Sequence, residues 1–312
     1  MDTCAESNKL KMKILLTGAT GLIGAKVTRV LEKDHLLYTL GRRKEQADQY
    51  FDLTAPDEQA ELTLPQSDWF VHCAGIVDED FSQNNPLLAF QKAVFGLEAL
   101  LKRVVSSGVR NFIYISSSHV YGTQAGLITE SSIQNPISNY AIAHYCSEQI
   151  FKKYANSVKG RLIILRPNAV YGLPNYIDSF QRWSLIPFSF PKEAKQYGKI
   201  VLKTMGNQRR NFVSTKSIAT LINRIISGDL LEYQGVLNVL GAHTESVYEF
   251  ALRCKKIAEN NFQIECEIVR PVLNANYPEI NIGNDFELKS VIAQHEPSSE
   301  LDDYLKKAYE LL

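Results

Sequence analysis

The segment TGATGLIG brings three glycines, Gly18, Gly21 and Gly24, into a turn that has the chemistry to bind an anion. The apolar run Lys13–Thr17 predicts a strand before the turn, and the helical spacing of apolar residues over Leu22–Leu31 predicts a helix after it. Glycines at this spacing keep the turn tight, let the backbone approach a pyrophosphate and let the helix pack on a sheet. The pyrophosphate would lie at the helix N-terminus, where free N–H groups favour an anion. The pattern predicts a dinucleotide site, and the alternative is an ordinary glycine-rich turn.

The end of the predicted second strand, Leu36–Leu40, favours one dinucleotide over another. Folds of this type that bind NAD carry an acidic residue there, which accepts a hydrogen bond from the ribose 2′-hydroxyl. This chain has Gly41 in that place, followed by Arg42 and Arg43. Two guanidinium groups beside a missing carboxylate suit a 2′-phosphate, so we predict NADP rather than NAD. The alternative is that the two arginines form only a solvated loop.

Strands and helices alternate along the first half of the chain and predict the sheet that positions this turn. The further strands are Trp69–His72, Phe112–Ile115 and Leu162–Leu165, and the clearest further helices are Pro86–Ser106 and Tyr140–Tyr154. Each parallel strand needs a crossover to return to the same side of the sheet. We therefore predict an α/β fold with a doubly wound, Rossmann-like parallel sheet.

The alternation weakens after Gly172, where Pro174, Pro187 and Pro191 punctuate a segment rich in Arg, Lys, Trp and Tyr. We interpret this segment as part of a smaller C-terminal substrate lobe. The later elements that we expect are a strand at Gly235–Leu240, a helix at Ser246–Glu259, a strand at Phe262–Val269 and a helix at Glu300–Leu312 that Ser298 or Ser299 caps. The predicted organisation is a flexible tail (1–12), a dinucleotide-binding domain (13–172, with a returning segment at about 211–241) and a substrate lobe (173–210 and 242–312).

The composition limits how this chain can hold charged molecules. Its 312 residues include 34 basic and 34 acidic ones, which gives a formal net charge of zero. No field of the whole molecule can hold nucleic acid or an anionic membrane, so any anion must bind through local charge. The five cysteines form no paired cluster, and we expect no disulfide framework, no metal site, no nucleic-acid partner and no membrane partner. The polar first twelve residues and the lack of a long apolar run predict a cytoplasmic protein.

Six further motifs follow the glycine turn in order. They are Asp52-Leu53, His72–Gly75, Ser116–Gly122, Tyr140 at a predicted helix start, Arg166–Gly172 and Arg210–Val213. Together they make nearly the whole chain resemble the extended short-chain dehydrogenase/reductase family, which includes NAD(P)-dependent sugar-nucleotide epimerases, dehydratases and reductases. The resemblance implies that hydride moves between the nicotinamide and a substrate carbon, while a tyrosine exchanges a proton with the substrate oxygen.

The resemblance also implies the catalytic roles, with Tyr140 as the acid/base and Ser117 as the orienting hydroxyl. The family places a lysine four residues after the tyrosine, on the same helix face, because a phenol with a pKa of about 10 is a poor base at neutral pH. Here His144 stands in that position, and none of the fifteen tyrosines has a lysine four residues later. We expect His144 to take over the lysine's hydrogen bond to the tyrosine or the ribose. A protonated His144 would lower the pKa of Tyr140 as lysine does, and a neutral one would do so weakly.

The binding residues follow from the same resemblance. For the cofactor it implies Gly18, Thr20, Gly21, Leu22, Ile23, Gly24, Arg42, Arg43, Asp52, Leu53, Cys73, Ala74, Gly75 and Pro167. For the substrate, a nucleotide-diphosphate sugar, it implies Ser118, His119, Asn168 and Arg210. A guanidinium at Arg210 suits a diphosphate because it can donate two parallel hydrogen bonds. A structural hydrogen bond is the alternative role of His119.

These observations predict an NAD(P)-dependent epimerase or reductase that acts on a carbonyl or secondary alcohol of a nucleotide-diphosphate sugar. Dehydration is the least expected reaction, because Ser118 and His119 occupy the two positions at which dehydratases generally add an acid beside the serine. A catalytically impaired, NADP-binding regulatory or scaffold protein of the same fold is the alternative. The resemblance also implies a homodimer formed through the two long helices.

Overall fold

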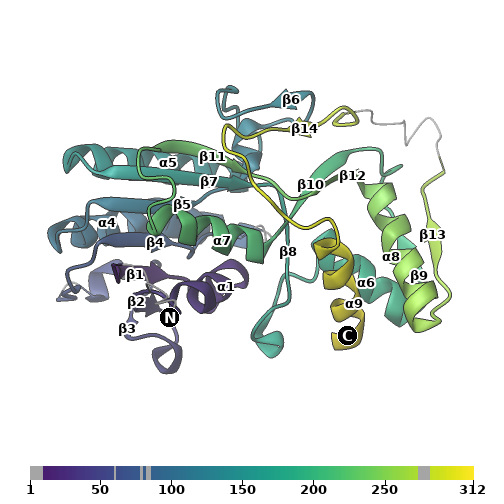
Figure 1. Cartoon of the computed structure of the whole chain (residues 1–312), viewed down its shortest axis with the longest axis horizontal. Coiled ribbons are helices and arrows are strands. Elements are labelled where there is room, and N and C mark those ends of the chain that lie inside the picture. Colours follow the sequence, from purple (N-terminus) through teal and green to yellow (C-terminus); the bar gives the residue numbers. More distant parts are fainter. Residues whose placement is uncertain (1–9, 60, 78–79, 82–85, 273–281) are drawn as a thin grey trace, which may run out of the picture.

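Seven parallel strands form the central sheet of the protein in the computed structural model (Figure 1). The structure describes residues 10–59, 61–77, 80–81, 86–272 and 282–312, so residues 1–9 of the predicted tail lie outside the described ranges. The strands are β1 (Lys13–Thr17), β2 (Leu36–Gly41), β3 (Gln49–Tyr50), β4 (Trp69–His72), β5 (Asn111–Ile115), β7 (Arg161–Pro167) and β11 (Gly235–Val239). Their spatial order is β11-β7-β5-β4-β1-β2-β3, so the direction in which the chain adds strands reverses between β1 and β4.

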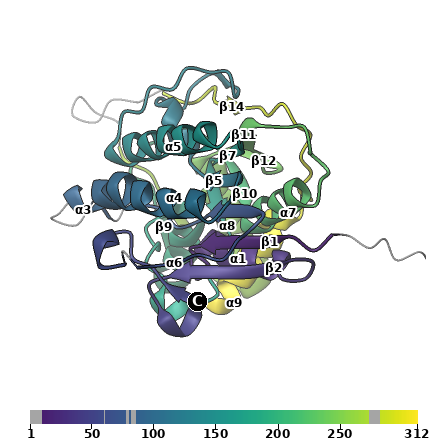
Figure 2. The same cartoon turned by 90° about the vertical axis from the view of Figure 1, so that its left-hand side faces the viewer.

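Helices cover both faces of this sheet (Figure 2). Ile14 and Leu16 of β1 pack in one cluster with α1 (Leu22–Leu31) and α7 (Thr215–Ile226). Leu15 packs on the opposite face, in a cluster with α4 (Leu97–Ser106) and α5 (Asn139–Ser157). Successive side chains of a strand point to opposite faces, so a strand that is covered on both sides is apolar at consecutive positions. The predicted doubly wound α/β fold is confirmed.

The long helix predicted at Pro86–Ser106 contains an irregular turn. It consists of α3 (Pro86–Phe90), a π-helical segment η3 (Gln91–Gly96) and α4. A Cβ built on Gly96 would lie 2.0 Å from the carbonyl oxygen of Leu53. Glycine therefore permits a close approach between this helix and the loop that contains Leu53. Single π turns inside helices frequently occur at functional sites.

A smaller lobe lies beside the sheet, at the right in Figure 1. It contains α6 (Ile186–Tyr197), β9 (Lys199–Val201), α8 (Val247–Phe262), β13 (Glu267–Val269) and α9 (Glu300–Leu311), and β9 pairs with β13. Phe188, Phe250 and Tyr309 are buried in the cluster that these helices enclose. β10 (Arg209–Ser214) pairs with β8 (Ala169–Tyr171) and β12 (His243–Ser246), and β6 (Leu127–Ile128) pairs with β14 (Glu287–Leu288). The division of the chain into two domains at the predicted boundaries stays a prediction.

Helix α6 is an element that the sequence did not predict, because prolines interrupt it. Pro187 lies in its first turn, where the missing N–H would have no helical partner in any case. Pro191 lies inside the helix and cannot donate to the carbonyl of Pro187. The hydroxyl of Tyr304 in α9 donates to that carbonyl instead, at 2.8 Å. A contact with a distant helix therefore offsets the local cost of the proline.

Two predictions at the ends of elements are wrong. The strand predicted at Phe262–Val269 begins only at Glu267, because α8 continues to Phe262 and ends at Gln263 in the left-handed conformation (φ +56°). Ser299 precedes α9 but makes no capping hydrogen bond, since its backbone is already helical (φ −77°, ψ −16°). A capping residue needs extended backbone to direct its oxygen at the helix N–H groups. Ser246, at the start of α8, has that geometry and caps the helix.

A buried ion pair joins the sheet to helix α5. Arg166 in β7 donates to both carboxylate oxygens of Glu148 in α5, from Nε at 2.8 Å and from Nη2 at 2.5 Å. Both side chains are fully buried. Ser116, which follows β5, donates to Glu148 at 2.6 Å, and the ring of Tyr121 lies 4.7 Å from the Arg166 guanidinium. The pair therefore links α5, β7 and the end of β5 at one point.

Removing one partner of this pair should destabilise the protein strongly. Glu148→Ala leaves the guanidinium of Arg166 buried without its counter-ion, so the free energy of unfolding should fall by about 3–5 kcal/mol. Lys153 lies on the same helix as Glu148 and forms an exposed ion pair with Glu98 of α4. Lys153→Ala should lower the free energy of unfolding by at most about 1 kcal/mol. Urea unfolding of both variants measures the two losses. Equal losses would contradict the anchoring role of the buried pair.

Candidate active site

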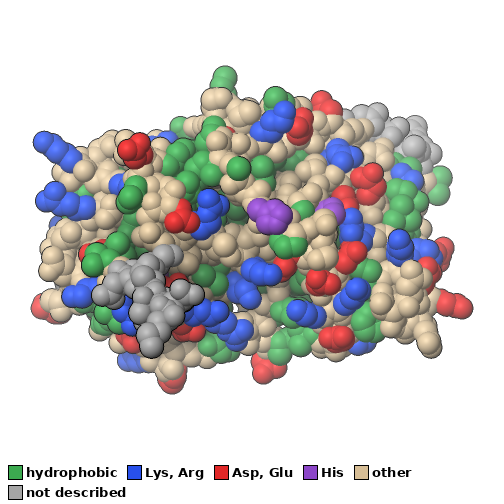
Figure 3. Space-filling model, in the orientation of Figure 1, with side chains coloured by type: hydrophobic (Ala, Val, Ile, Leu, Met, Phe, Trp, Pro, Cys, Tyr) green, Lys and Arg blue, Asp and Glu red, His purple; other side chains and the backbone are tan. Residues whose placement is uncertain are grey.

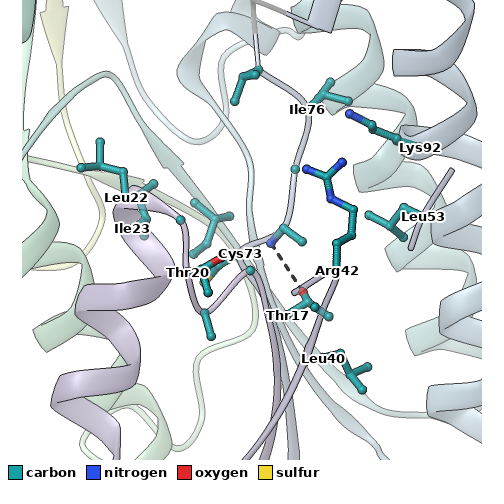
Figure 4. A pocket seen from close by; sticks show the side chains of 18 of the residues that line it. Thr17, Thr20, Leu22, Ile23, Leu40, Arg42, Leu53, Cys73, Ile76 and Lys92 are labelled. Atoms are coloured by element: carbon teal, nitrogen blue, oxygen red, sulfur yellow. Dashed lines mark hydrogen bonds between the residues drawn. The ribbon is translucent and has the colours of Figure 1, made fainter. Parts of the chain in front are cut away.

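A cavity of about 470 Å³ opens at the carboxyl ends of β1 and β4, where the strand order reverses. Open α/β sheets bind ligands at this switch point. The predicted cofactor residues that line the cavity are Gly18, Thr20, Gly21, Leu22, Ile23, Arg42, Arg43, Asp52, Leu53, Cys73, Ala74 and Gly75 (Figure 4). Gly24 is buried behind the turn, and Pro167 lines a second cavity instead.

The geometry of the glycine turn fits a pyrophosphate. Gly18 has a φ of +75°, and a Cβ on it would lie 2.5 Å from the backbone nitrogen of Ala74. A Cβ on Gly24 would lie 2.0 Å from the carbonyl oxygen of Gly18, so a larger residue would push α1 away from the turn. Gly21 precedes α1 and supplies no side-chain cap. The first N–H groups of α1 are therefore available to an anion in the cavity.

Polar contacts beneath the turn hold the ends of β1 and β4 together. The Ala74 N–H donates to Oγ1 of Thr17 at 3.5 Å, and Oγ1 lies 2.7 Å from Nδ1 of His72 (Figure 4 shows the first bond). Burial lowers the pKa of His72 to about 3, so the ring is neutral at pH 7. Cys73, which follows β4, lines the first cavity. Burial raises the pKa of its thiol to about 12, which keeps the thiol protonated and unreactive at neutral pH.

Positive side chains also line the first cavity. Arg42 and Arg43 follow β2, and Gly41 leaves no acidic side chain beside them. In Figure 4 the guanidinium of Arg42 points across the cavity towards Lys92. Lys92 belongs to the π-helical segment η3 and pairs with Asp80 at 2.7 Å. No pattern in the sequence singles out Lys92, because a lysine in a predicted helix usually belongs to a solvated face.

A second cavity of about 600 Å³ lies between the sheet and the smaller lobe. The predicted site residues that line it are Ser117, His119, Tyr140, Pro167, Asn168 and Arg210. Tyr140 and Arg182 line both cavities, together with Ile23 and Ser116. Tyr140 therefore lies on the wall between the two spaces.

Helix α5 begins at a defined residue and so directs Tyr140 to this wall. The Oγ of Ser138 accepts a hydrogen bond from the Ala141 N–H at 3.2 Å and caps the helix. The ring centroid of Tyr140 lies 4.6 Å from that of His144 and 5.9 Å from that of His119, both edge to face. Ser117 accepts from the His119 N–H at 3.3 Å. Tyr140 and His144 thus both line the first cavity, and Tyr140 and Ser117 both line the second.

His144 lies one turn further along α5 and is neutral. Its ring is buried, with Nδ1 2.7 Å from the Tyr114 hydroxyl and Nε2 without a hydrogen-bond partner in the described part of the chain. Burial is the main cause that lowers the pKa of His144 to about 3, and electrostatic interactions with His119, Arg182 and His72 contribute to the same shift. Of the two protonation states considered for His144, the structure selects the neutral one at pH 7. The residue can form a hydrogen bond there but supplies no charge.

Ser118 does not reach either cavity. It is fully buried, donates to Oε1 of Gln124 at 3.3 Å and accepts from Nδ2 of Asn168 at 2.7 Å. Asn168 lines the second cavity, but its amide also donates to Gln124 at 2.8 Å and accepts from the Asn211 N–H at 3.0 Å. The two residues therefore hold the loops around the cavity in place, and Ser118 is not positioned to touch a substrate.

Two arginines bring positive charge to the second cavity. Arg210 in β10 donates from Nη1 to the carbonyl of Arg209 at 2.8 Å, and burial lowers its pKa. A guanidinium pKa is so high that Arg210 remains charged at neutral pH. Arg182 lies in irregular chain between β8 and α6, and its Nε is buried without a hydrogen-bond partner among the residues described. No pattern in the sequence distinguishes Arg182 from other arginines.

The described residues show neither a metal cluster nor a membrane span. They contain no group of three or more His, Cys, Asp or Glu side chains that could hold a metal ion. No helix among them has the length and apolarity needed to cross a membrane. On the face shown in Figure 3, acidic and basic side chains are interspersed over both the sheet and the smaller lobe.

Comparison with known proteins agrees with this geometry. A family described as the NAD dependent epimerase/dehydratase family matches residues 14–239, which include the glycine turn and Tyr140. The chain belongs to this family. A nicotinamide dinucleotide is the cofactor typical of the NAD dependent epimerase/dehydratase family.

Relatives and solved structures match almost the whole chain. A GDP-6-deoxy-D-talose 4-dehydrogenase of Aggregatibacter actinomycetemcomitans is 28% identical over 294 residues, which cover 90% of this chain and 95% of the relative. The structure of a UDP-glucose 4-epimerase with UDP-glucose from Thermotoga maritima superposes with a TM-score of 0.74 at 20% identity and covers 96% of this chain and 98% of its own. RMD from Pseudomonas aeruginosa complexed with NADPH has a TM-score of 0.73 at 21% identity, with the same coverage. These similarities support the epimerase/dehydratase fold.

Acid should destabilise the protein. His72 and His144 are neutral in the folded chain, with pKa values of about 3, whereas an unfolded histidine binds a proton below about pH 6.5. Between about pH 6.5 and pH 3 the unfolded state binds more protons than the folded state, so the free energy of unfolding falls as the pH decreases. Each of the two histidines should contribute about 1.4 kcal/mol per pH unit in that window. Urea unfolding at several pH values measures the slope, and His144→Gln should reduce it by the share of one histidine. A titration midpoint of the His144 ring above pH 5, measured by NMR, would contradict its low pKa.

Proposed function

We propose that the protein is an NADP-dependent epimerase or reductase that acts on a carbonyl or secondary alcohol of a nucleotide-diphosphate sugar. The observation that carries this proposal is the position of Tyr140 on the wall between the cavity at the glycine turn and the cavity lined by Arg210. A phenol at that wall can exchange a proton with an oxygen of a ligand in the second cavity. The family to which the chain belongs supports hydride transfer as the accompanying step.

Each residue at the wall has a proposed task. A nicotinamide bound in the first cavity would supply or accept the hydride. Tyr140 takes the proton of the substrate hydroxyl when the alcohol is oxidised and returns a proton to the oxygen when the carbonyl is reduced. Ser117 accepts from the His119 N–H, so its own proton is available to donate to the same substrate oxygen. Nε2 of His144 has no partner among the described residues, which suits a hydrogen bond with a hydroxyl of the cofactor ribose.

Epimerisation or reduction fits the site better than dehydration. Dehydratases generally place an acid directly after the serine, and Ser118 is buried in contacts with Gln124 and Asn168. Burial, followed by the charge of Arg210, lowers the pKa of His119 to about 4, so this residue is neutral and a poor proton donor at neutral pH.

The positive charges that line the first cavity beside β2 support NADP as the preferred cofactor. Arg42 and Arg43 follow a strand that ends in Gly41, and Lys92 faces the same space. Guanidinium groups form strong, charge-assisted hydrogen bonds with a phosphate. A carboxylate that would bind the ribose 2′-hydroxyl of NAD is absent at the end of β2.

A cofactor-binding regulatory or scaffold protein is the second candidate. The neutral state of His144 favours it, because the pair Tyr140–His144 lacks the charge that a lysine would supply.

The homodimer also stays a proposal. Leu87 and Phe95, on the long helical segment, are 76% and 69% exposed, and a second copy of the chain would cover such side chains.

Tyr140→Phe should lower the rate of hydride transfer by at least about 100-fold, because the variant loses the proton that Tyr140 exchanges. Binding of the dinucleotide should be nearly unchanged, since the ring remains. Stopped-flow absorbance of the nicotinamide with a panel of nucleotide sugars measures the rate, and Tyr197→Phe, at a largely exposed tyrosine of the smaller lobe, is the control. Equal rates in wild type and Tyr140→Phe would rule out the catalytic assignment. Binding of NADP without hydride transfer for any sugar would favour the regulatory protein.

Arg42→Ala should weaken the binding of NADP by about 10- to 100-fold, because hydrogen bonds with charged groups contribute about 1.5–3 kcal/mol. The affinity for NAD should hardly change. Arg29→Ala removes an exposed arginine from the last turn of α1 and serves as the matched control. Isothermal titration calorimetry with both dinucleotides measures the affinities. A wild-type preference for NAD would contradict the proposal.

A further inference from the structure

The site contains a tyrosine but lacks the cation that a lysine at position 144 would place one helical turn away. His144 is neutral, and its Nδ1 lies 2.7 Å from the hydroxyl of Tyr114. A phenol with a reference pKa of about 10 keeps its proton at neutral pH unless an opposite charge lies within a few ångströms. If Tyr140 acts as a base, a cationic side chain that assists it has to come from another element than α5.

Titratable and charged groups from several elements lie near Tyr140 or line the two cavities that it separates. In the part of the chain that the structure describes, the rings of His144 in α5 and His119 in the turn after Ser117 contact Tyr140, and Tyr114 in β5 interacts with it. The further groups line one cavity or both: Arg42, Arg43, Asp52, Cys73 and Lys92 line the first, Glu193, Lys203 and Arg210 line the second, and Arg182 lines both. The two histidines are neutral at pH 7. Lys92 lines only the first cavity and pairs with Asp80, and Arg210 lines only the second. Arg182 is the one cation among them that lines both cavities, as Tyr140 does.

The charge of Arg182 acts on the place where Tyr140 lies. It contributes to the lowered pKa of His144, whose ring centroid is 4.6 Å from that of Tyr140. A positive field that opposes protonation of a histidine also favours ionisation of a neighbouring tyrosine. Nε of Arg182 is buried and has no partner among the described residues, so part of the guanidinium is removed from water. Water screens such a charge less than it screens an exposed one.

We propose that Arg182 supplies the positive charge that stabilises the ionised form of Tyr140. This inference rests on the proposed function of Tyr140 as an acid/base. Arg182 thereby takes the electrostatic part of the lysine's role, and His144 keeps the hydrogen-bonding part. The two parts come from different regions of the chain, since His144 belongs to the helix on the sheet and Arg182 to the segment that leads into the smaller lobe.

The test measures the ionisation of Tyr140 directly, in protein without cofactor or substrate. Tyrosine labelled with carbon-13 at Cζ gives one resonance for each tyrosine, and Tyr140→Phe identifies the one of interest. Arg182→Gln should move the titration midpoint of Tyr140 upward by about 1–3 pH units, because a neighbouring opposite charge has an effect of this size. Arg182→Lys should restore most of the shift. Lys199→Gln removes an exposed lysine of the smaller lobe and should leave the midpoint unchanged.

A double variant and the pH dependence of turnover complete the test. Adding His144→Lys to Arg182→Gln should lower the midpoint again, because it restores a cation one helical turn from the tyrosine. In turnover, Arg182→Gln should move the rise of kcat/KM to higher pH by the same amount as the midpoint. An unchanged midpoint would overturn the inference, and so would a higher KM with an unchanged pH profile, which is the result expected if Arg182 only binds substrate. A midpoint that moves in a protein without turnover would support the inference and overturn the proposed function.

Discussion

The buried pair of Arg166 and Glu148 determines where helix α5 presents its side chains. Tyr140, His144 and Glu148 are four residues apart, so they follow one another along one face of the helix. Arg166 holds the last of them from β7, and Ser116 holds it from the end of β5. Separating buried partners of this kind costs several kcal/mol, so the helix cannot slide or rotate on the sheet without that loss. The position of Tyr140 between the two cavities follows from this anchor and from the cap at Ser138.

The neutral net charge of the chain is consistent with three local sites for anions. At the glycine turn, backbone N–H groups at the start of α1 suit a phosphate without any charged side chain. Arg42, Arg43 and Lys92 line the same cavity, and Arg182 and Arg210 line the second. Fields from such groups are screened by salt beyond about 10 Å, so they act on a ligand inside a cavity far more than on a distant polymer. Small phosphorylated molecules match this distribution of charge.

The sequence predicted the sheet and the glycine turn beside the first cavity because their signals are local. An apolar run, a glycine turn and an amphipathic helix follow each other within about twenty residues, and β1 and α1 begin and end where these patterns do. The elements that the sequence did not predict depend on contacts between residues that are far apart along the chain. Helix α6 tolerates Pro191 because Tyr304, more than a hundred residues later, bonds the carbonyl that the proline leaves free.

The site residues that the sequence misplaced or missed depend on the same kind of distant contact. Ser117 and Ser118 are neighbours in the motif, yet only the first reaches a cavity, because the short turn that follows β5 directs the second towards Gln124. Arg182 could not be distinguished in advance, since the packing of the whole chain determines which arginine of an irregular segment reaches the wall between the cavities.

The surroundings of position 144 explain why a neutral ring is stable there. The ring centroid of Tyr114 lies 6.0 Å from that of His144 and 4.8 Å from that of Phe151, and His72 lies 5.8 Å from the same tyrosine. Tyr114 packs beside the imidazole and is itself flanked by Phe151 and His72, so the imidazole is buried and a charged group in its place would lose part of its hydration. A half-buried guanidinium at the edge of the cavities keeps part of its hydration and can still act on Tyr140. Dividing the lysine's role between His144 and Arg182 therefore avoids the cost of a buried charge, and it makes the acidity of the tyrosine depend on how the smaller lobe is placed against the sheet.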